Sequence, residues 1–186
     1  MHSKSYRFLT PLIMVLTWAN MEAQTSHPVP RLVVNVTIDQ LRTDYMEAFS
    51  SLFGAGGFNK VMRDGRSYMD AAYPFSHIDR ASAVACIMTG TVPYDNGIVG
   101  EHWMDRKTLR PMYCVDDATC EGWLTSEKYS PVALNVSTVT DELKMATGGR
   151  ALVYSIAPDA DAAILAAGHA ADGAFWICLL YTSPSP

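Results

Sequence analysis

Apolar positions recur along the chain in short blocks, and their spacing alternates between that of buried strands and that of helices. The first block, residues 32–39, reads Leu-Val-Val-Asn-Val-Thr-Ile-Asp, which is too short for an ordinary helix and too continuous for a half-exposed strand. We expect the buried first strand of a parallel sheet here. Because ligands bind beyond the carboxyl ends of such strands, Asp39 would lie at a site. Alternatively, Asp39 only caps the helix that follows.

The later blocks continue this alternation of strand and helix. The expected elements are a helix over 42–53, a short helix over 58–63, an extended segment over 67–73, a helix over 80–88, a hairpin within 101–127, a helix over 135–146 and a strand over 151–156. Such an order predicts an α/β fold with a doubly wound, mostly parallel sheet. No repeat and no second domain boundary is visible.

Composition and charge narrow the possible partners. The chain has 186 residues, of which 49% are hydrophobic and 18% charged, as in ordinary globular proteins. Its formal net charge is −5, and no segment carries a cluster of Lys and Arg. We therefore expect no nucleic-acid partner, because binding to phosphate backbones needs a basic surface.

The first 23 residues have the order of a secretory signal peptide. Lys4 and Arg7 precede an apolar stretch at 8–19, and Ala23 ends a segment suited to cleavage. A membrane span is the rival interpretation, but 8–19 is well short of the roughly 20 apolar residues that cross a bilayer. We expect cleavage, no membrane span in the mature protein, and export to the periplasm or cell envelope.

The last ten residues look foreign to the rest of the chain. Residues 177–186, Ile-Cys-Leu-Leu-Tyr-Thr-Ser-Pro-Ser-Pro, resemble a translated sequencing adapter, so we expect a non-native tail. In that case residues 24–176 are the N-terminal part of a domain that is incomplete at its C-terminus. The alternative is a genuine Pro/Ser-rich terminus, which would be disordered.

Two cysteines lie close together in a polar segment. Cys114 and Cys120 are six positions apart, and an exported protein meets an oxidising compartment. A small-loop disulfide between them is therefore expected.

A family resemblance rests on several separate motifs. Residues 89–98, Thr-Gly-Thr-Val-Pro-Tyr-Asp-Asn-Gly-Ile, resemble the Thr-Gly-x-x-Pro-x-x-His-Gly-Ile segment of the alkaline phosphatase superfamily, in its type I phosphodiesterase / nucleotide pyrophosphatase branch. Residues 32–45 resemble the opening strand and metal aspartate of that branch. Residues 56–58, 167–170 and 174–176 are similar to bacterial phosphate-irrepressible alkaline phosphatases. The resemblance covers residues 32–176.

The resemblance implies an exported, metal-dependent hydrolase of small phosphate esters. Two zinc ions about 4 Å apart would activate the nucleophile and the leaving oxygen. Asp39 matches the family's first metal ligand, and a carboxylate on a strand end suits zinc when histidines complete the shell. The remaining ligands would lie beyond residue 177. We therefore expect this chain alone to be inactive.

The chain departs from the family at four positions. Arg80 stands at the nucleophile position, nine residues before Thr89, and a guanidinium binds phosphate but cannot attack it. Ser82 is the alternative nucleophile and would require a slip of two residues. Glu101 replaces a phosphate-binding Asn, so an acceptor stands where the family has a donor. Asp159 and Asp161 replace a Lys and an Arg that reach the phosphoryl group.

Two functional hypotheses follow from these departures. In the first, the protein is an active hydrolase with an altered site, in which Ser82 or a displaced hydroxyl attacks, Arg80 clamps the anion and Asp39 binds zinc. In the second, it is a catalytically inactive paralogue that serves as a binding or assembly module in the cell envelope. The joint loss of hydroxyl, amide donor and cations motivates the second hypothesis.

Overall fold

The structure is a computed structural model that describes residues 29–177. The expected signal peptide at 1–23 and all but the first residue of the expected tail at 177–186 lie outside the described residues. The chain divides into two compact units, residues 1–33 and residues 34–186. Residues 29–33, the described part of the first unit, form no helix or strand. None of the helices in the described part is long and apolar enough to span a membrane.

The second unit mixes short helices with two small sheets. In chain order the elements are α2 (Thr43–Ala48), the 3-10 helix η1 (Ser50–Leu52), α3 (Gly57–Asp64), α4 (Arg80–Thr89), α5 (Pro93–Asn96), β1 (His102–Met104), β2 (Pro111–Tyr113), α6 (Val139–Ala146), β3 (Tyr154–Ala157), α7 (Ala160–Ala167) and β4 (Gly173–Trp176). Strands β1 and β2 form an antiparallel hairpin, and β3 pairs with β4 in parallel.

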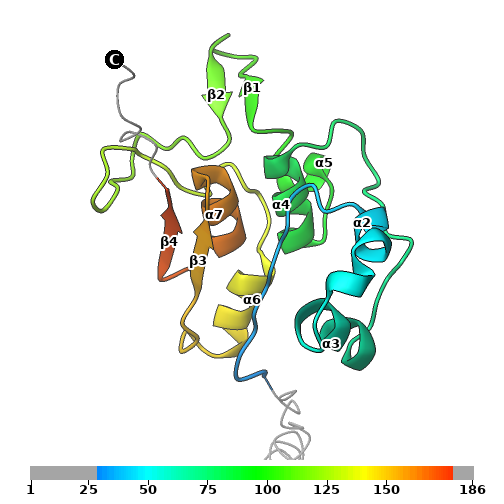
Figure 1. Cartoon of the computed structure of the whole chain (residues 1–186). Helices are drawn as coiled ribbons and strands as arrows, with labels where there is room; N and C mark the ends of the chain where they lie inside the picture. Colours follow the sequence, from blue (N-terminus) through cyan, green and yellow to red (C-terminus); the bar gives the residue numbers. More distant parts are fainter. Residues whose placement is uncertain (1–28, 178–186) are drawn as a thin grey trace, which may run out of the picture. The chain divides into compact units, whose positions relative to one another are not determined.

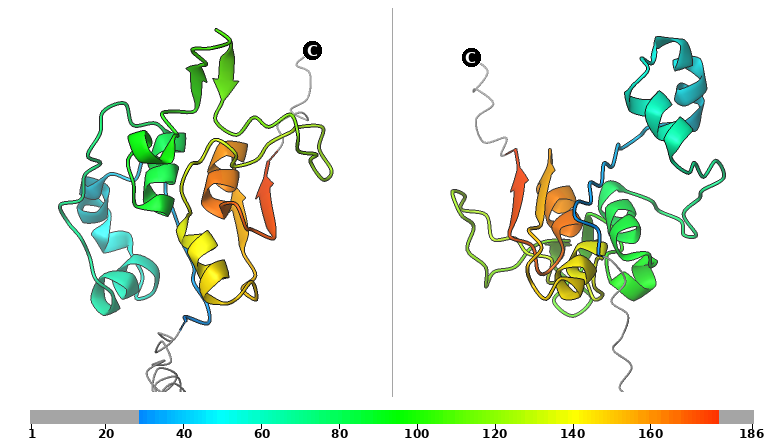
Figure 2. Two further views of the ribbon diagram at one scale, coloured as in Figure 1. Left: turned by 180° about the vertical axis from the view of Figure 1, so that it is seen from behind. Right: turned by 90° about the horizontal axis from the view of Figure 1, so that it is seen from below.

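Helix α7 lies between α4 and the β3–β4 sheet. It packs against α4 on one side and against β3 and β4 on the other (Figures 1 and 2). Its sequence, Ala-Asp-Ala-Ala-Ile-Leu-Ala-Ala, is apolar almost all round, as expected of a helix covered on every side. Because β3 and β4 run in parallel, α7 is the crossover that joins them.

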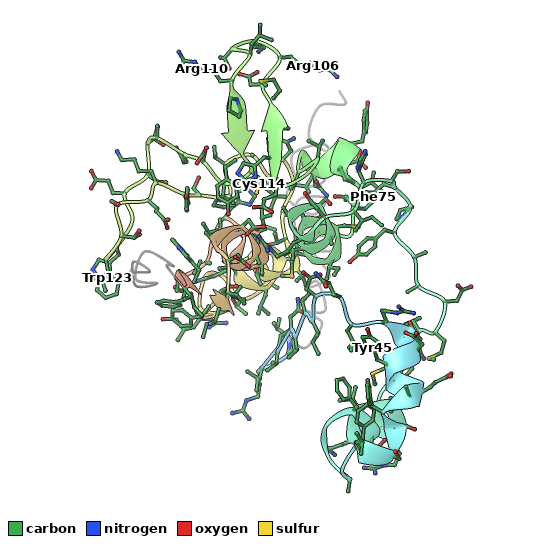
Figure 3. The ribbon with its side chains drawn as sticks, turned by 45° about the horizontal axis from the view of Figure 1, so that its top comes forward. Tyr45, Phe75, Arg106, Arg110, Cys114 and Trp123 are labelled. Atoms are coloured by element: carbon green, nitrogen blue, oxygen red, sulfur yellow. The ribbon has the colours of Figure 1, made fainter. Side chains whose placement is uncertain are left out.

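The hydrophobic core fills the space between α4, α7 and the base of the β1–β2 hairpin. Figure 3 shows Cys114 at that base and Arg106 and Arg110 at the far end of the hairpin. The buried core residues are Ala81, Val84, Ala85, Met88, Ile98, Cys114, Val115, Leu134, Ala160, Ala162, Ile164 and Leu165. Small side chains on both helices allow α4 and α7 to approach closely.

A polar cluster fixes the start of α6. Thr138 caps the helix and exchanges hydrogen bonds with Asp141, whose carboxylate also contacts His169 Nδ1 at 3.1 Å and accepts from the Ala170 N–H at 2.8 Å. Burial alone would raise the pKa of Asp141, but these hydrogen bonds lower it. Gly168 has φ +80°, and a Cβ there would collide with Thr138 and Asp141. Only glycine fits this position.

Several predicted elements are confirmed and others are wrong. The helices expected at 58–63, 80–88 and 135–146, the hairpin within 101–127 and the strand at 151–156 all form, with bounds shifted by a few residues. The helix expected at 42–53 breaks into α2 and η1. The extended segment at 67–73, which we expected to be the second strand of the sheet, forms no strand. Instead of one mostly parallel sheet, the described residues form two sheets of two strands each.

The buried first strand expected at residues 32–39 is not formed. The segment is irregular, and Val34 and Val36 are 71% and 73% exposed. A β-strand needs a neighbour to take up its backbone hydrogen bonds. No strand of the described residues pairs with this segment, so its apolar pattern alone does not produce a strand.

The disulfide expected between Cys114 and Cys120 is also not formed. Both thiols are free. Cys114 is fully buried, and burial raises the pKa of its thiol, which keeps it protonated. The Cys120 thiol instead donates to the Asp117 carboxylate, with the sulfur 3.3 Å from Oδ2. The spacing in the sequence gave no information on these separate environments.

The packing around α7 makes its leucine sensitive to truncation. Leu165 is fully buried, whereas Leu152 is 74% exposed. We expect Leu165→Ala to lower the free energy of unfolding by about 2–4 kcal/mol, because it removes buried methyl groups and leaves a cavity. Leu152→Ala, the matched control, should change it by less than about 0.5 kcal/mol. Urea unfolding followed by circular dichroism measures both, and equal effects would contradict the central placement of α7.

Candidate functional site

The candidate site is a cluster of charges around the first residue of α4. The Arg80 Nε lies 3.1 Å from Asp161 Oδ2 and its Nη2 lies 3.0 Å from Asp161 Oδ1, so this pair is bidentate. Arg80 Nη1 is 3.0 Å from Asp159 Oδ2, and Nη2 is 3.5 Å from Glu101 Oε2. These four residues form what we call the Arg80 cluster. It joins α4, the segment before β1 and the start of α7.

The three carboxylates of the cluster stabilise the positive charge of Arg80. Helix N-termini carry a partial positive charge, so Arg80 at the start of α4 is placed unfavourably unless anions compensate it. Three carboxylates surround the single guanidinium, which leaves the cluster with a net charge of −2. The bidentate pair with Asp161 is the main reason that the pKa of Arg80 is raised. Asp161 is fully buried, and Arg80 is 29% exposed.

Tyr113 connects the hairpin to the cluster. Its hydroxyl donates to Asp161 Oδ1 at 3.3 Å and accepts from the Asp161 backbone N–H at 3.2 Å. Burial and the nearby Asp161 charge raise the pKa of Tyr113, so the hydroxyl stays protonated. Asp161 is therefore held both by Arg80 and from the end of β2.

Asp79 positions the two halves of the cluster, and the sequence reasoning missed it. Its Oδ1 accepts from the Ser82 N–H at 2.9 Å and caps α4, while its Oδ2 accepts from the Glu101 N–H at 2.6 Å. Gly100 lies so close that an added Cβ would be 3.0 Å from Oδ2. The available signal was the Asp-x-x-Ser spacing of a capping box. One carboxylate thus fixes the start of α4, where Arg80 lies, and the backbone of Glu101.

Ser82, the alternative nucleophile, is part of this cap. The residue is fully buried, and its hydroxyl donates to Asp79 Oδ1 at 2.7 Å and accepts from the Asp79 N–H at 3.1 Å. Attack on a substrate would require the start of α4 to open. The nucleophilic role of Ser82 stays a prediction, and the geometry assigns it a structural one.

Asp39, the expected metal ligand, is not among the residues that pair with Arg80. Its side chain is exposed, and its charge contributes to the raised pKa of Tyr73, after burial and Cys86. No hydrogen bond or ion pair joins Asp39 to Arg80. Within residues 29–177, no three His, Cys, Asp or Glu side chains come together where they could hold a metal ion. The described donors do not fit a zinc pair, and metal ligation by Asp39 stays a prediction.

An open pocket of about 360 Å³ lies beside the Arg80 cluster. Arg80, Glu101 and Asp159 form part of its wall, and Tyr113 and Trp176 form another part. The cluster is therefore accessible to a small ligand from this side. Within the pocket, the guanidinium donors already face carboxylates, and no nucleophilic hydroxyl stands at the Arg80 position.

Comparison with known proteins finds one family and several relatives. The family described as type I phosphodiesterase / nucleotide pyrophosphatase matches residues 33–184. The chain is 41% identical over 150 residues to alkaline phosphatase PhoV of Synechococcus elongatus, covering 79% of this chain and 27% of PhoV. It is 32% identical over 174 residues to alkaline phosphatase PafA of Elizabethkingia meningoseptica, covering 91% of this chain and 32% of PafA. The chain thus spans about a third or less of these relatives.

Solved structures of PafA share the fold. The crystal structure of wild-type PafA matches with a TM-score of 0.75 and 34% identity, over 82% of this chain and 30% of that one. A PafA mutant matches with a TM-score of 0.71 and 32% identity. That mutant is substituted at a threonine and an asparagine 21 positions apart, and at a lysine and an arginine two positions apart. Arg80 and Glu101, and Asp159 and Asp161, have these same separations.

The structure brings together four of the six residues singled out in the sequence. Arg80, Glu101, Asp159 and Asp161 meet in one cluster of ion pairs. Ser82 lies beside them within the cap of α4. Asp39 does not join them. The roles assigned to these residues stay predictions.

The buried pair in the cluster should dominate its energetics. We expect Asp161→Asn to lower the free energy of unfolding by about 2 kcal/mol, because a charged, bidentate hydrogen bond is lost at a fully buried position. Asp159→Asn, at a carboxylate that is 42% exposed, should cost less than about 1 kcal/mol. In an Arg80→Met background, Asp161→Asn should instead stabilise. Additive effects in this double-mutant cycle would contradict the pairing.

The cap of α4 should make stability depend on pH. The pKa of Asp79 is lowered because hydrogen bonds from Ser82 and Glu101 outweigh burial. A carboxyl with a lowered pKa in the folded state stabilises above its unfolded pKa, and this contribution is lost as the pH falls through the folded pKa. We expect Asp79→Asn to cost about 1–2 kcal/mol at pH 7, because Asn can still cap α4 but its amide NH2 cannot accept from the Glu101 N–H.

Unfolding in urea at a series of pH values measures this contribution. The gap between wild type and Asp79→Asn should narrow below about pH 4, because protonated Asp79 resembles the amide. Asp70→Asn, at an exposed carboxylate, is the matched control. A gap that stays constant down to pH 2 would contradict the capping role of the Asp79 charge.

Proposed function

Because the chain belongs to the type I phosphodiesterase / nucleotide pyrophosphatase family, we propose that it is part of a family member whose phosphate site has become a closed arginine–carboxylate cluster. The protein then binds a ligand or partner without hydrolysing phosphate esters. One observation supports this proposal above the others, namely that the Arg80 guanidinium lies among Asp159, Asp161 and Glu101. The activity of the whole protein is part of the proposal, since the chain spans about a third or less of its relatives.

The charges of the cluster oppose a phosphate dianion. Two unit charges 4 Å apart repel by roughly 4 kcal/mol at an effective dielectric constant of 20. One guanidinium offsets only one of the three carboxylates, and its donors already face those carboxylates. Ionised carboxylates offer a phosphate oxygen no hydrogen-bond donor. Of the two properties that the family needs at these positions, the attacking hydroxyl is missing, and the remaining donor group, the Arg80 guanidinium, already faces carboxylates.

The competing proposal is an exported, metal-dependent phosphoric ester hydrolase. The 41% identity to an alkaline phosphatase favours it. This enzyme would take its zinc ligands, apart from Asp39, from residues outside the described range. Ser82 would have to leave the cap of α4 to attack a small phosphate ester, with Arg80 as the anion clamp. The buried cap makes this the less supported of the two proposals.

We also propose that the protein is exported and that its fold continues beyond this chain. The order of charge, apolar stretch and Ala23 in the first 23 residues supports secretion to the periplasm or cell envelope, where a binding or assembly role would be exercised. We propose that in a longer protein the β3–β4 pair is extended into a doubly wound, mostly parallel sheet. The match to wild-type PafA over 82% of this chain supports that extension.

Phosphate binding separates the two proposals. By isothermal titration calorimetry, we expect the chain to show no saturable binding of inorganic phosphate at millimolar concentration. The variant Arg80→Thr/Glu101→Asn/Asp159→Lys/Asp161→Arg should bind phosphate at least tenfold more tightly, because it inverts the charge of the site. The milder variant Glu101→Asn/Asp159→Lys alters only half-exposed positions and should gain part of that affinity if the full variant unfolds.

Turnover provides the opposing outcome. We expect little or no hydrolysis of p-nitrophenyl phosphate by the full-length protein with added zinc, since residues 29–177 alone lack the remaining metal ligands under either proposal. Robust zinc-dependent turnover that Ser82→Ala abolishes, with the unfolding curve unchanged, would establish the hydrolase and overturn the proposal. Tight phosphate binding by the wild type would overturn it as well.

A further inference from the structure

The pocket beside the Arg80 cluster has walls of two kinds. Four carboxylates line it, those of Glu101, Asp116, Glu127 and Asp159, and Arg80 is the only lysine or arginine among its lining residues. The remaining lining includes the rings of His102, Tyr113, Tyr129 and Trp176. We call this the acidic aromatic pocket. Its volume of about 360 Å³ suits a small organic molecule.

The aromatic wall is a continuous series of rings. His102 stacks on Tyr113 with the ring centroids 4.8 Å apart, and Tyr113 meets Tyr129 edge-on at 5.3 Å. Tyr129 is in turn 6.1 Å from Trp176. The series runs from the hairpin to the end of β4, so rings from three separate parts of the chain face one volume. All four of these side chains line the pocket, so the wall is aromatic along its length.

Glu127 is held in place at one end of this wall. Its Oε2 accepts from the Trp176 indole Nε1 at 3.0 Å. Within residues 29–177, its Oε1 forms no hydrogen bond or ion pair with another residue. The indole therefore fixes one oxygen of this carboxylate at the pocket wall. Glu127 does not contact Arg80, so the guanidinium does not compensate the negative charge at this end of the pocket.

We propose that the acidic aromatic pocket binds a small organic cation, an ammonium group that contacts the Trp176 and Tyr129 rings and pairs with Glu127. Aromatic faces attract such cations, and carboxylates supply the opposite charge. The inference rests on the proposed function, because a pocket that received phosphate dianions would need the reverse charge. It names the class of ligand that the altered site accepts in place of the family's anion.

The observations favour an organic cation over the other ligand classes. Four carboxylates against one guanidinium repel anions. A bare metal ion would need several close oxygen or nitrogen donors, and no group of three that could hold one lies within residues 29–177. A neutral apolar ligand would use the rings but would gain nothing from the negative charge of the four carboxylates. Only a cation with an apolar surface uses both walls.

Calorimetric titration with tetramethylammonium chloride tests the proposal on the full chain. We expect saturable binding with a dissociation constant on the order of millimolar, as one ammonium group in an open pocket provides. The indole resonance of Trp176 should shift during the titration in NMR spectra. Binding should weaken with added sodium chloride, because the ion pair is screened. Tert-butanol, a neutral molecule of similar shape, should bind at least tenfold more weakly.

Variants localise the binding. Glu127→Gln and Trp176→Leu should each weaken tetramethylammonium binding about tenfold or more, while Glu121→Gln, an exposed carboxylate outside the pocket lining, should leave it unchanged. Trp176→Phe keeps an aromatic ring and should retain part of the affinity, which provides a second measurement if the leucine variant unfolds. Equal binding of tert-butanol, or unchanged affinity in Glu127→Gln, would overturn the proposal.

The same titrations separate this inference from the proposed function. If neither tetramethylammonium nor inorganic phosphate binds the wild-type chain, only the cation site is refuted. If phosphate binds and tetramethylammonium does not, the proposed function and the cation site fall together.

Discussion

The bidentate pair between Arg80 and Asp161 is the interaction on which the site depends. It connects the first turns of α4 and α7, the two helices that enclose the core, and it buries one carboxylate completely. A buried carboxylate is tolerated only when its hydrogen bonds are satisfied, and Arg80 together with Tyr113 satisfies Asp161. The other charges follow from this pair. Asp159 and Glu101 occupy the remaining side of the guanidinium, which leaves the surroundings acidic.

Local patterns in the sequence predicted the elements that local forces form. The helices α3 and α4 form within a residue or two of the expected bounds, and a hairpin forms within the turn-rich segment 101–127. The strand predicted at residues 32–39 does not form, because a strand needs a neighbouring strand and no strand of the described residues pairs with this segment. The disulfide predicted between Cys114 and Cys120 does not form, for a related reason. Spacing does not reveal that one thiol faces the core and the other a carboxylate.

The positions of the candidate site were singled out from the sequence, but the contacts among them were not predicted, and their roles stay predictions. The family pattern identified Arg80, Glu101, Asp159 and Asp161, and the separations of the mutated PafA residues agree with it. What could not be read from the sequence is that these residues pair with one another. Complementary charges that are far apart in the chain become partners only once α4 and α7 pack together. The aromatic wall was missed for the same reason, since its rings come from three separate segments.

Asp79 has a consequence for how such a site can change over time. Its two oxygens fix the backbone of Ser82 and Glu101, and neither contact involves the side chains at 80 or 101. The frame that sets the distance between these positions is therefore independent of the chemistry displayed on it. Substitutions at positions 80 and 101 can therefore accumulate without rebuilding this frame, so a lineage can change the chemistry displayed there while the backbone that spaces the two positions stays in place.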